Sequence, residues 1–146
     1  MFEKLNELKS IHETAMKQIK ASGEGALKEA LREFFEKFLN VAALRWSQYT
    51  PYFNDGDSCT FSVNEPRLRF IETPDDDESG DYEDGYLSTW DLHDKPEHKE
   101  LLAAFEEFGS VIQSDSMEAV LLAMFGDHVE VTATRDKIEA DSYSHE

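Results

Sequence analysis

The stretch LKEALREFFEKFLNVAALRW, residues 27–46, decides the fold expected from this sequence. Its apolar residues recur at steps of three and four, which is the spacing of one face of an α-helix. The stripe is wide and rich in phenylalanine, which predicts burial on more than one side. We therefore expect a central core helix that begins near Glu24 and ends before Pro51, because a residue that precedes proline is disfavoured in the helical conformation.

A second, amphipathic helix is expected on the N-terminal side of the core helix. Residues 3–20 place apolar side chains from Leu5 to Ile19 at helical spacing among charged residues. Ser-Gly-Glu-Gly at 22–25 favours a turn, because two glycines so close together lower helix propensity. We expect residues 1–22 to form a separate helix, whose apolar stripe becomes a surface for homo-oligomerisation if the domain leaves it uncovered.

The middle of the chain changes to the two-residue period of strands. Apolar and polar residues alternate over 59–63 and 67–71, on either side of Asn-Glu-Pro at 64–66, which predicts a hairpin. Residues 86–90 are expected to add a third strand. The stretch YTPYFNDGDSCTF, at 49–61, is expected to form the corner between core helix and hairpin, because Asn-Asp-Gly-Asp is strong turn chemistry.

The last third of the chain is expected to hold two further helices and a terminal hairpin. Glycines mark the expected ends of both helices, and apolar alternation marks the hairpin. These elements are expected at residues 94–109, 115–126 and 129–140. The order of elements predicts a single α+β domain over residues 1–146, with the N-terminal helices packed on a mostly antiparallel sheet.

The composition indicates a cytoplasmic protein with a strongly acidic second half. Cys59 has no second cysteine to pair with, which favours a reducing compartment, and the N-terminal residues contain no apolar run typical of a signal peptide or membrane span. The net charge is −18. Residues 1–50 hold 8 basic and 7 acidic side chains, whereas residues 51–146 hold 6 and 25. Because this field repels phosphate, we expect the second half to bind a basic protein and not DNA or RNA.

The densest acidic run, residues 73–85, is expected to be a mobile, solvated loop. Its carboxylates would speed association with a basic partner, and the aromatic side chains in and after it would become buried anchors. The partner-binding residues expected on this basis are Asp75, Asp76, Asp77, Glu78, Asp81, Tyr82, Glu83, Asp84, Tyr86 and Trp90.

The aromatic corner offers an alternative site for a small ligand. Aromatic rings there could stack on a nucleotide base, and nearby arginines could balance its phosphate. The residues of this alternative are Trp46, Tyr49, Tyr52, Asn54, Asp55, Arg67 and Arg69. The other interpretation of the corner is a buried aromatic mini-core where helix and strand meet, which we favour.

No metal, cofactor or catalytic residue is expected. Asp75, Asp77 and Gly80 match part of a calcium-binding loop, but Tyr86 stands where that loop needs a glutamate. The five histidines are scattered and no zinc spacing, phosphate-binding loop or nucleophile motif is present. An acid and base pair at Asp55 and Asp57 is a third, weaker hypothesis.

Two segments resemble a group of small acidic bacteriophage-type proteins of uncharacterised function. They are RWSQYTPYFNDGDSCTFSVNEP, residues 45–66, and MFGDHVEVTATRD, residues 124–136. The resemblance covers about residues 25–70 and 115–146 and transfers no site. It implies a setting in which acidic proteins inhibit host enzymes by presenting carboxylates in place of phosphates. The first functional hypothesis is therefore a non-enzymatic inhibitor of a nucleic-acid-binding or defence protein in the host cytoplasm.

Overall fold

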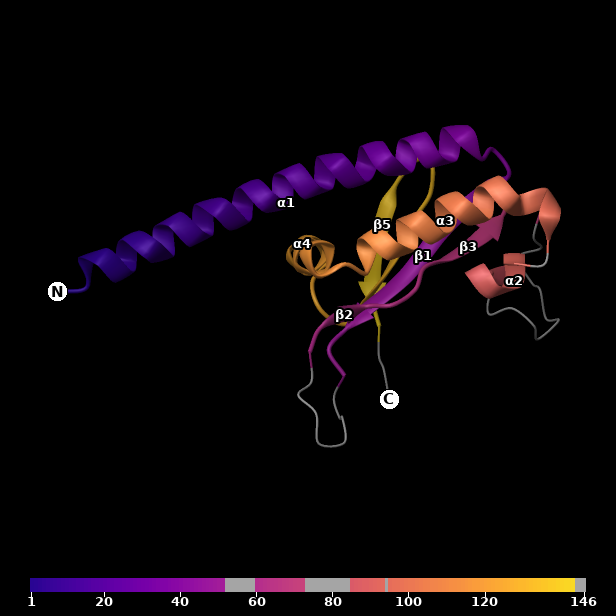
Figure 1. Cartoon of the computed structure of the whole chain (residues 1–146). Coiled ribbons are helices and arrows are strands. Elements are labelled where there is room, and N and C mark those ends of the chain that lie inside the picture. Colours follow the sequence, from indigo (N-terminus) through magenta and orange to yellow (C-terminus); the bar gives the residue numbers. More distant parts are fainter. Residues whose placement is uncertain (52–59, 73–84, 94, 144–146) are drawn as a thin grey trace.

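The computed structural model describes residues 1–51, 60–72, 85–93 and 95–143, which form an α+β fold (Figure 1). In chain order the elements are α1 (Glu3–Lys37), β1 (Val41–Tyr49), β2 (Ser62–Val63), β3 (Arg67–Phe70), α2 (Thr89–His93), η2 (Pro96–His98), α3 (Lys99–Ile112), α4 (Asp115–Phe125), β4 (Val129–Ala133) and β5 (Ile138–Ser142). Every strand pairing between them is antiparallel. The predicted α+β class with an antiparallel sheet is therefore confirmed.

One long helix, α1, replaces the two helices expected at the N-terminus. It is 35 residues long and passes through Ser-Gly-Glu-Gly without a break, so the predicted turn is wrong. Gly23 has a packing role instead, because a Cβ atom on it would clash with Cγ1 of Val120 in α4. The low helix propensity of this glycine is offset by the close approach of α4 that its missing side chain allows.

The predicted core helix is wrong beyond Lys37, where the chain leaves the helix and enters β1. The pairing of β1 with β3 shifts register between Val41 and Ala43, which marks a β-bulge. The bulge lets Val41, Ala43 and Leu44 all be buried, together with Trp46 farther along β1. This spacing of buried apolar residues resembles the helical period, which is why the sequence pattern indicated a helix.

The sheet is built around β1, which pairs with β4 on one side and with β2 and β3 on the other. Because β2 and β3 lie end to end along the same edge of β1, they do not pair with each other and the predicted hairpin is wrong. Of the third expected strand, only Leu87 pairs, in a bridge to Leu68. The terminal hairpin is confirmed as β4 and β5.

The helices of the second half largely match the sequence expectation. α4 begins after Ser114, whose side chain accepts a hydrogen bond from the backbone nitrogen of Met117, and ends before Gly126, whose φ is 90°. α3 runs through Gly109 to Ile112, so the predicted stop at Gly109 is wrong. A Cβ atom on Gly109 would lie 3.2 Å from Cδ of Pro66, so this glycine also serves a close contact.

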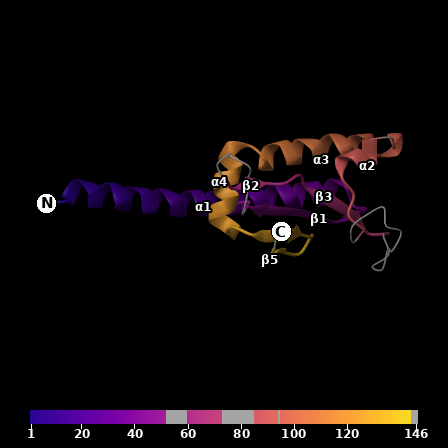
Figure 2. The ribbon, with the colours of Figure 1, turned by 90° about the horizontal axis from the view of Figure 1, so that it is seen from below.

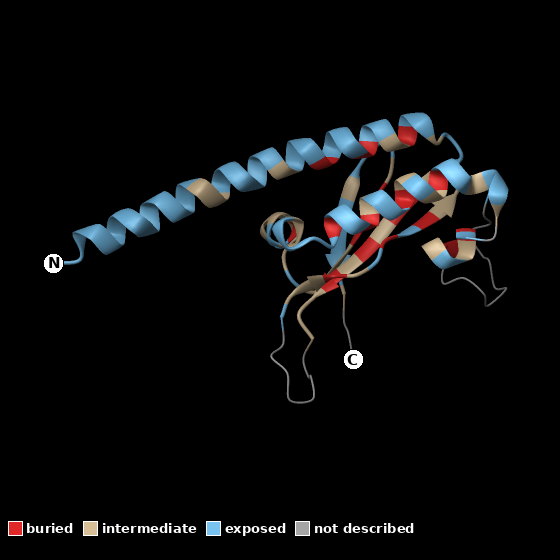
Figure 3. Ribbon diagram, viewed as in Figure 1, coloured by how far each residue is buried: buried red, intermediate tan, exposed pale blue. Residues whose placement is uncertain are grey.

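The helices cover one face of the sheet and leave the opposite face open. The rings of Phe108 in α3 and Phe125 in α4 lie 5.8 and 6.3 Å from the ring of Trp46. Since successive side chains of a strand point to opposite faces, Arg45 and Ser47 point away from these helices. In α1, buried residues occur only in the C-terminal part, and the N-terminal half extends beyond the rest of the molecule (Figures 2 and 3).

Candidate functional site

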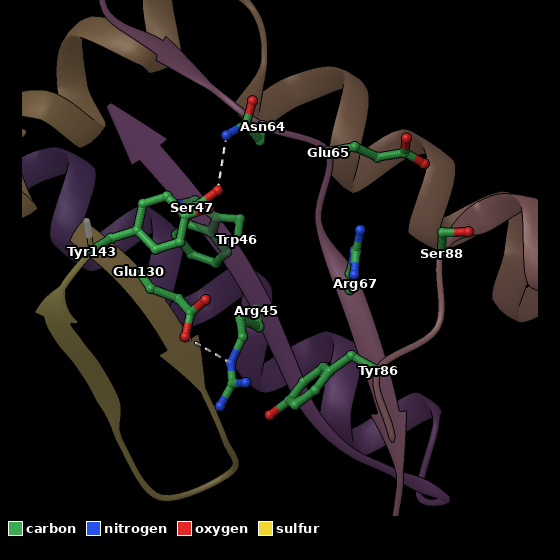
Figure 4. Close-up of a pocket in the computed structure, with 10 residues that line it drawn as sticks. All are labelled: Arg45, Trp46, Ser47, Asn64, Glu65, Arg67, Tyr86, Ser88, Glu130 and Tyr143. Atoms are coloured by element: carbon green, nitrogen blue, oxygen red, sulfur yellow. Dashed lines mark hydrogen bonds and ion pairs between the residues drawn. The ribbon is translucent and has the colours of Figure 1, made fainter. Parts of the chain in front are cut away.

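A cavity of about 320 Å³ lies on the open face of the sheet. This volume is at the small end of the range of ligand pockets. The cavity is bounded by β1, β3 and β4 and by the segments before α2 and after β5. Its lining residues are Arg45, Trp46, Ser47, Asn64, Glu65, Arg67, Tyr86, Ser88, Glu130 and Tyr143 (Figure 4).

Arg45 is held in the cavity wall by contacts with three neighbouring residues. Its Nε donates to Oγ1 of Thr132 at 3.1 Å and lies 3.5 Å from Oε1 of Glu130 on the neighbouring strand. The guanidinium carbon lies 4.2 Å from the ring centroid of Tyr86, which places the charge over the aromatic face. These contacts fix the guanidinium within the cavity wall and partly neutralise its charge.

Fixed polar groups form the other side of the cavity. The side-chain amide of Asn64 donates to Oγ of Ser47 at 2.8 Å. The hydroxyl of Thr89 donates to Oε1 of Glu65. The cavity therefore combines cations, carboxylates, hydroxyls and amides, a set suited to orienting a small polar ligand by hydrogen bonds.

Trp46 does not offer its ring to a ligand, because it is only 1% exposed and packs among the helices. Its Nε1 donates to Oε1 of Gln48 at 3.0 Å. The amide nitrogen of the buried Gln48 in turn donates to the carbonyl oxygens of Leu121 and Gly126, at 3.0 and 2.9 Å. Trp46 is thus a core residue that ties β1 to the end of α4. Its ring packs on Phe108 and Phe125 of the helices, whereas the mini-core interpretation had grouped it with the other rings of the corner.

Tyr49 lies on the open face, in a stack of rings at the end of β1. Its ring centroid is 5.6 Å from that of Tyr143 and 6.4 Å from that of His128, with interplanar angles of 28° and 17°. Tyr143 also lines the cavity. The aromatic corner is therefore divided between the two faces of the sheet, because Trp46 and Tyr49 are an odd number of residues apart on one strand.

The remaining residues of the ligand alternative are not brought together. Arg67 lines the cavity, whereas Arg69, two residues along β3, does not. Tyr52, Asn54 and Asp55 lie outside the residues that the structure describes.

The two anchors expected for a protein partner differ sharply in exposure. Tyr86 is 6% exposed beneath Arg45, so it is not a surface anchor in this conformation. Trp90 is 80% exposed on α2, where its ring stacks on His93 at 6.2 Å. The other expected partner-binding residues, 75–84, lie outside the described part of the chain, as do most of the calcium-loop positions and Cys59.

Several cavity residues were not anticipated from the sequence. Ser47, Asn64 and Ser88 carry no motif, and they meet only because distant segments pack side by side. The position of Glu130 could have been predicted from the sequence. It lies between Val129 and Val131 in a predicted strand, so its side chain was expected to face away from the core.

Comparisons with protein-family models, curated proteins and solved structures find no match to this chain. Among the described residues, no group of three or more His, Cys, Asp or Glu side chains is placed to hold a metal ion. None of the helices in that part of the chain has the length and apolar character needed to cross a membrane. The described residues thus form an α+β fold with an exposed tryptophan on α2 and a small polar cavity, in a chain whose net charge is −18.

Proposed function

We propose that this protein is a non-enzymatic, acidic interaction protein that binds a basic protein in the cytoplasm. In this proposal the partner is a nucleic-acid-binding or defence protein, and the acidic half inhibits it by occupying the surface that binds phosphates, as in a phage-type inhibitor. The observation that carries the proposal is the exposure of Trp90, which follows the densest acidic run closely in the sequence.

Trp90 has the properties of a binding anchor. Tryptophan is enriched among the residues that dominate protein interfaces. The start of its helix, α2, is held by reciprocal hydrogen bonds. Oδ2 of Asp91 accepts from the backbone nitrogen and hydroxyl of Ser88, at 2.8 and 3.0 Å, and Oγ of Ser88 accepts from the backbone nitrogen of Asp91 at 3.4 Å. Because the start of this helix is already ordered, binding through Trp90 would carry a smaller entropic cost.

The charge of the sequence around Trp90 supplies the attraction in this proposal. From Glu72 through Asp94 the chain contains ten acidic residues and no lysine or arginine, and Trp90 belongs to this segment. Such a concentration of negative charge would steer a cationic partner, and the rate of association would fall with rising salt.

The proposal predicts that Trp90→Ala weakens binding to the partner by about 10-fold or more, the loss typical of a central anchor. Proteins captured from lysate by the immobilised wild-type chain would be identified by mass spectrometry and their dissociation constants measured. The matched control is Val111→Ala, which removes an exposed side chain from the far end of α3 and should change the affinity less than twofold.

A second pair of variants tests the charges. One neutralises Asp75, Asp76, Asp77 and Glu78 to the corresponding amides, and the other does the same at Glu24, Glu29, Glu33 and Glu36 on the outside of α1. Both remove four charges, but only the first should slow association. Equal effects from the two sets would mean that net charge alone governs binding and would contradict a localised acidic site.

The cavity supports a second candidate function, the binding of a small anionic molecule such as a nucleotide. The observation that favours it is that Arg45, Arg67 and Tyr86 all line the same cavity (Figure 4). A ligand phosphate or carboxylate would be held by charge-assisted hydrogen bonds.

A thermal-shift screen with nucleotides tests this second candidate. A ligand that binds in the cavity should raise the melting temperature of the wild type and of Arg69→Gln, but not of Arg67→Gln. The two variants remove the same charge from one strand, and only Arg67 lines the cavity. A screen in which no nucleotide shifts the wild type contradicts the candidate.

A further inference from the structure

The apolar stripe of α1 runs from end to end of the helix, but only its C-terminal part is covered by the body of the protein. Leu27, Leu31 and Phe35 are buried. Toward the N-terminus the same stripe continues into solvent, where exposure is 61% for Phe2, Leu5 and Leu8, 57% for Ile11 and 42% for Ile19. We call residues 2–22 the arm, which projects from the body in both views (Figures 1 and 2).

We propose that the arm pairs with the arm of a second copy of this chain, in antiparallel orientation, to form a homodimer. An isolated helix of about this length is only marginally stable in water, and most helical stability in proteins comes from packing of an amphipathic face. The stripe needs a partner helix, and a second copy supplies one with the same length and spacing. This inference is independent of the proposed function.

The charge of the body determines the orientation. In a parallel pair the two bodies would lie side by side, and each contains the half of the chain with 25 acidic and 6 basic residues. In an antiparallel pair the arms separate the bodies by about 30 Å, the length of a 20-residue helix. This distance is several times the Debye length of about 8 Å at physiological salt, so the repulsion between the bodies is screened.

The charges of the arm do not oppose close pairing. Residues 3–9 contain Glu3, Lys4, Glu7 and Lys9, and residues 13–20 contain Glu13, Lys17 and Lys20. Because acidic and basic side chains are nearly balanced along the arm, the charge of the bodies sets the orientation.

The apolar area of the arm suits a weak, reversible dimer. Full burial of one large apolar side chain removes about 60–120 Å² of apolar surface from water, by the usual transfer coefficient. Five such side chains on each arm, each roughly half exposed, give about 350–650 Å² in the pair. Because interfaces are about 60% apolar, the total is about 600–1,100 Å², which reaches the roughly 1,000 Å² of a specific interface only at its upper end. The dimer is therefore expected to be weak and to form only as the protein concentration rises.

Sedimentation equilibrium of the full chain tests the dimer. The wild type should rise from 16.7 kDa toward twice that mass as its concentration increases from about 1 to 200 μM. Leu8→Glu should weaken the dimer at least 100-fold, whereas Ser10→Glu, which adds the same charge on the polar face of the arm, should weaken it less than threefold. A wild type that stays monomeric throughout, or equal effects of both substitutions, would overturn the proposal. So would a monomer that instead sediments with anionic lipid vesicles.

Disulfide trapping tests the orientation. In a Cys59→Ser background, chains carrying Lys4→Cys and chains carrying Lys20→Cys should form a mixed disulfide when combined and oxidised. Neither chain alone should cross-link efficiently, because like positions lie at opposite ends of an antiparallel pair. Efficient self-linking of the Lys4→Cys chain would show a parallel dimer and overturn the proposed arrangement.

Discussion

Asp127 joins the end of β1 to the start of β4 through three hydrogen bonds. Its carboxylate accepts from the backbone nitrogen and hydroxyl of Thr50, at 2.8 and 2.7 Å, and from the backbone nitrogen of His128 at 2.9 Å. Desolvation by partial burial raises the pKa of Asp127, but the hydrogen bonds from Thr50 and His128 together outweigh it. The pKa of Asp127 is therefore lowered from its ordinary value.

Asp127→Asn should consequently change the acid dependence of stability. A carboxyl group whose pKa is lower in the folded state stabilises the fold above its unfolded pKa of about 3.9, and this contribution is lost as the pH falls through the folded pKa. Because the site is exposed, the wild type should melt only about 1–3 °C above the variant at pH 7. The difference should shrink below about pH 4.

The measurement is thermal unfolding from pH 7 to pH 2.5. Asp136→Asn, which removes the same charge in the turn between β4 and β5, is the control. A gap between wild type and Asp127→Asn that stays constant to the lowest pH would contradict a role for the ionised carboxylate.

Among the elements, the contact between α1 and α4 explains why a helix tolerates two glycines. Gly23 lies under α4, where a Cβ atom would meet Val120, whereas Gly25 has nothing within 4 Å of the corresponding position. Gly23→Ala should destabilise the protein by about 1–3 kcal/mol through overpacking. Gly25→Ala should stabilise it by about 0.5–1 kcal/mol, because alanine is the better helix former.

Chemical denaturation of both variants at one fixed protein concentration measures these effects. The two glycines are two residues apart on one helix, so each substitution is the control for the other. If both substitutions changed the free energy of unfolding in the same direction, helix propensity would decide stability at these positions, and the contact with Val120 would not.

The elements that the sequence predicted well are those specified by local signals. α4 has a serine cap and a terminal glycine, and the hairpin of β4 and β5 has a clear two-residue alternation. β1 was mistaken for a helix because its identity depends on pairing with residues more than 80 positions away, such as Leu44 with Ala133. Similarly, the sequence pattern of β2 and β3 predicted a hairpin, because two alternating segments separated by a short break are typical of one. The pattern does not reveal that both segments pair with β1 and not with each other.

The candidate site was predictable to a smaller extent than the fold. Of the residues named for the ligand alternative, Arg67 lines the cavity and Trp46 is buried in the core. The cavity itself draws on Ser47, Ser88 and Tyr143, which only the tertiary packing brings together. Periodicity determines which face of an element a residue occupies, but it does not determine which elements become neighbours.

In the whole molecule, charge is divided unevenly along the chain. Residues 1–50, which contain all of α1, are nearly neutral, whereas residues 51–146, which contain α2, α3 and α4, have 19 more acidic than basic residues. A near-neutral arm suits association between copies, and an acidic body suits a cationic partner. In our proposal the two surfaces have separate roles, so a monomeric arm variant should retain the binding properties of the body.

The salt dependence of capture tests the central claim most directly. The immobilised wild-type chain would be exposed to lysate at 50 and 500 mM salt, with and without duplex DNA, and the bound proteins quantified by mass spectrometry. The account predicts basic, nucleic-acid-binding proteins that are captured at low salt, lost at high salt, displaced by DNA and absent with Trp90→Ala. Capture that is equally strong at both salt concentrations and unaffected by DNA would contradict it.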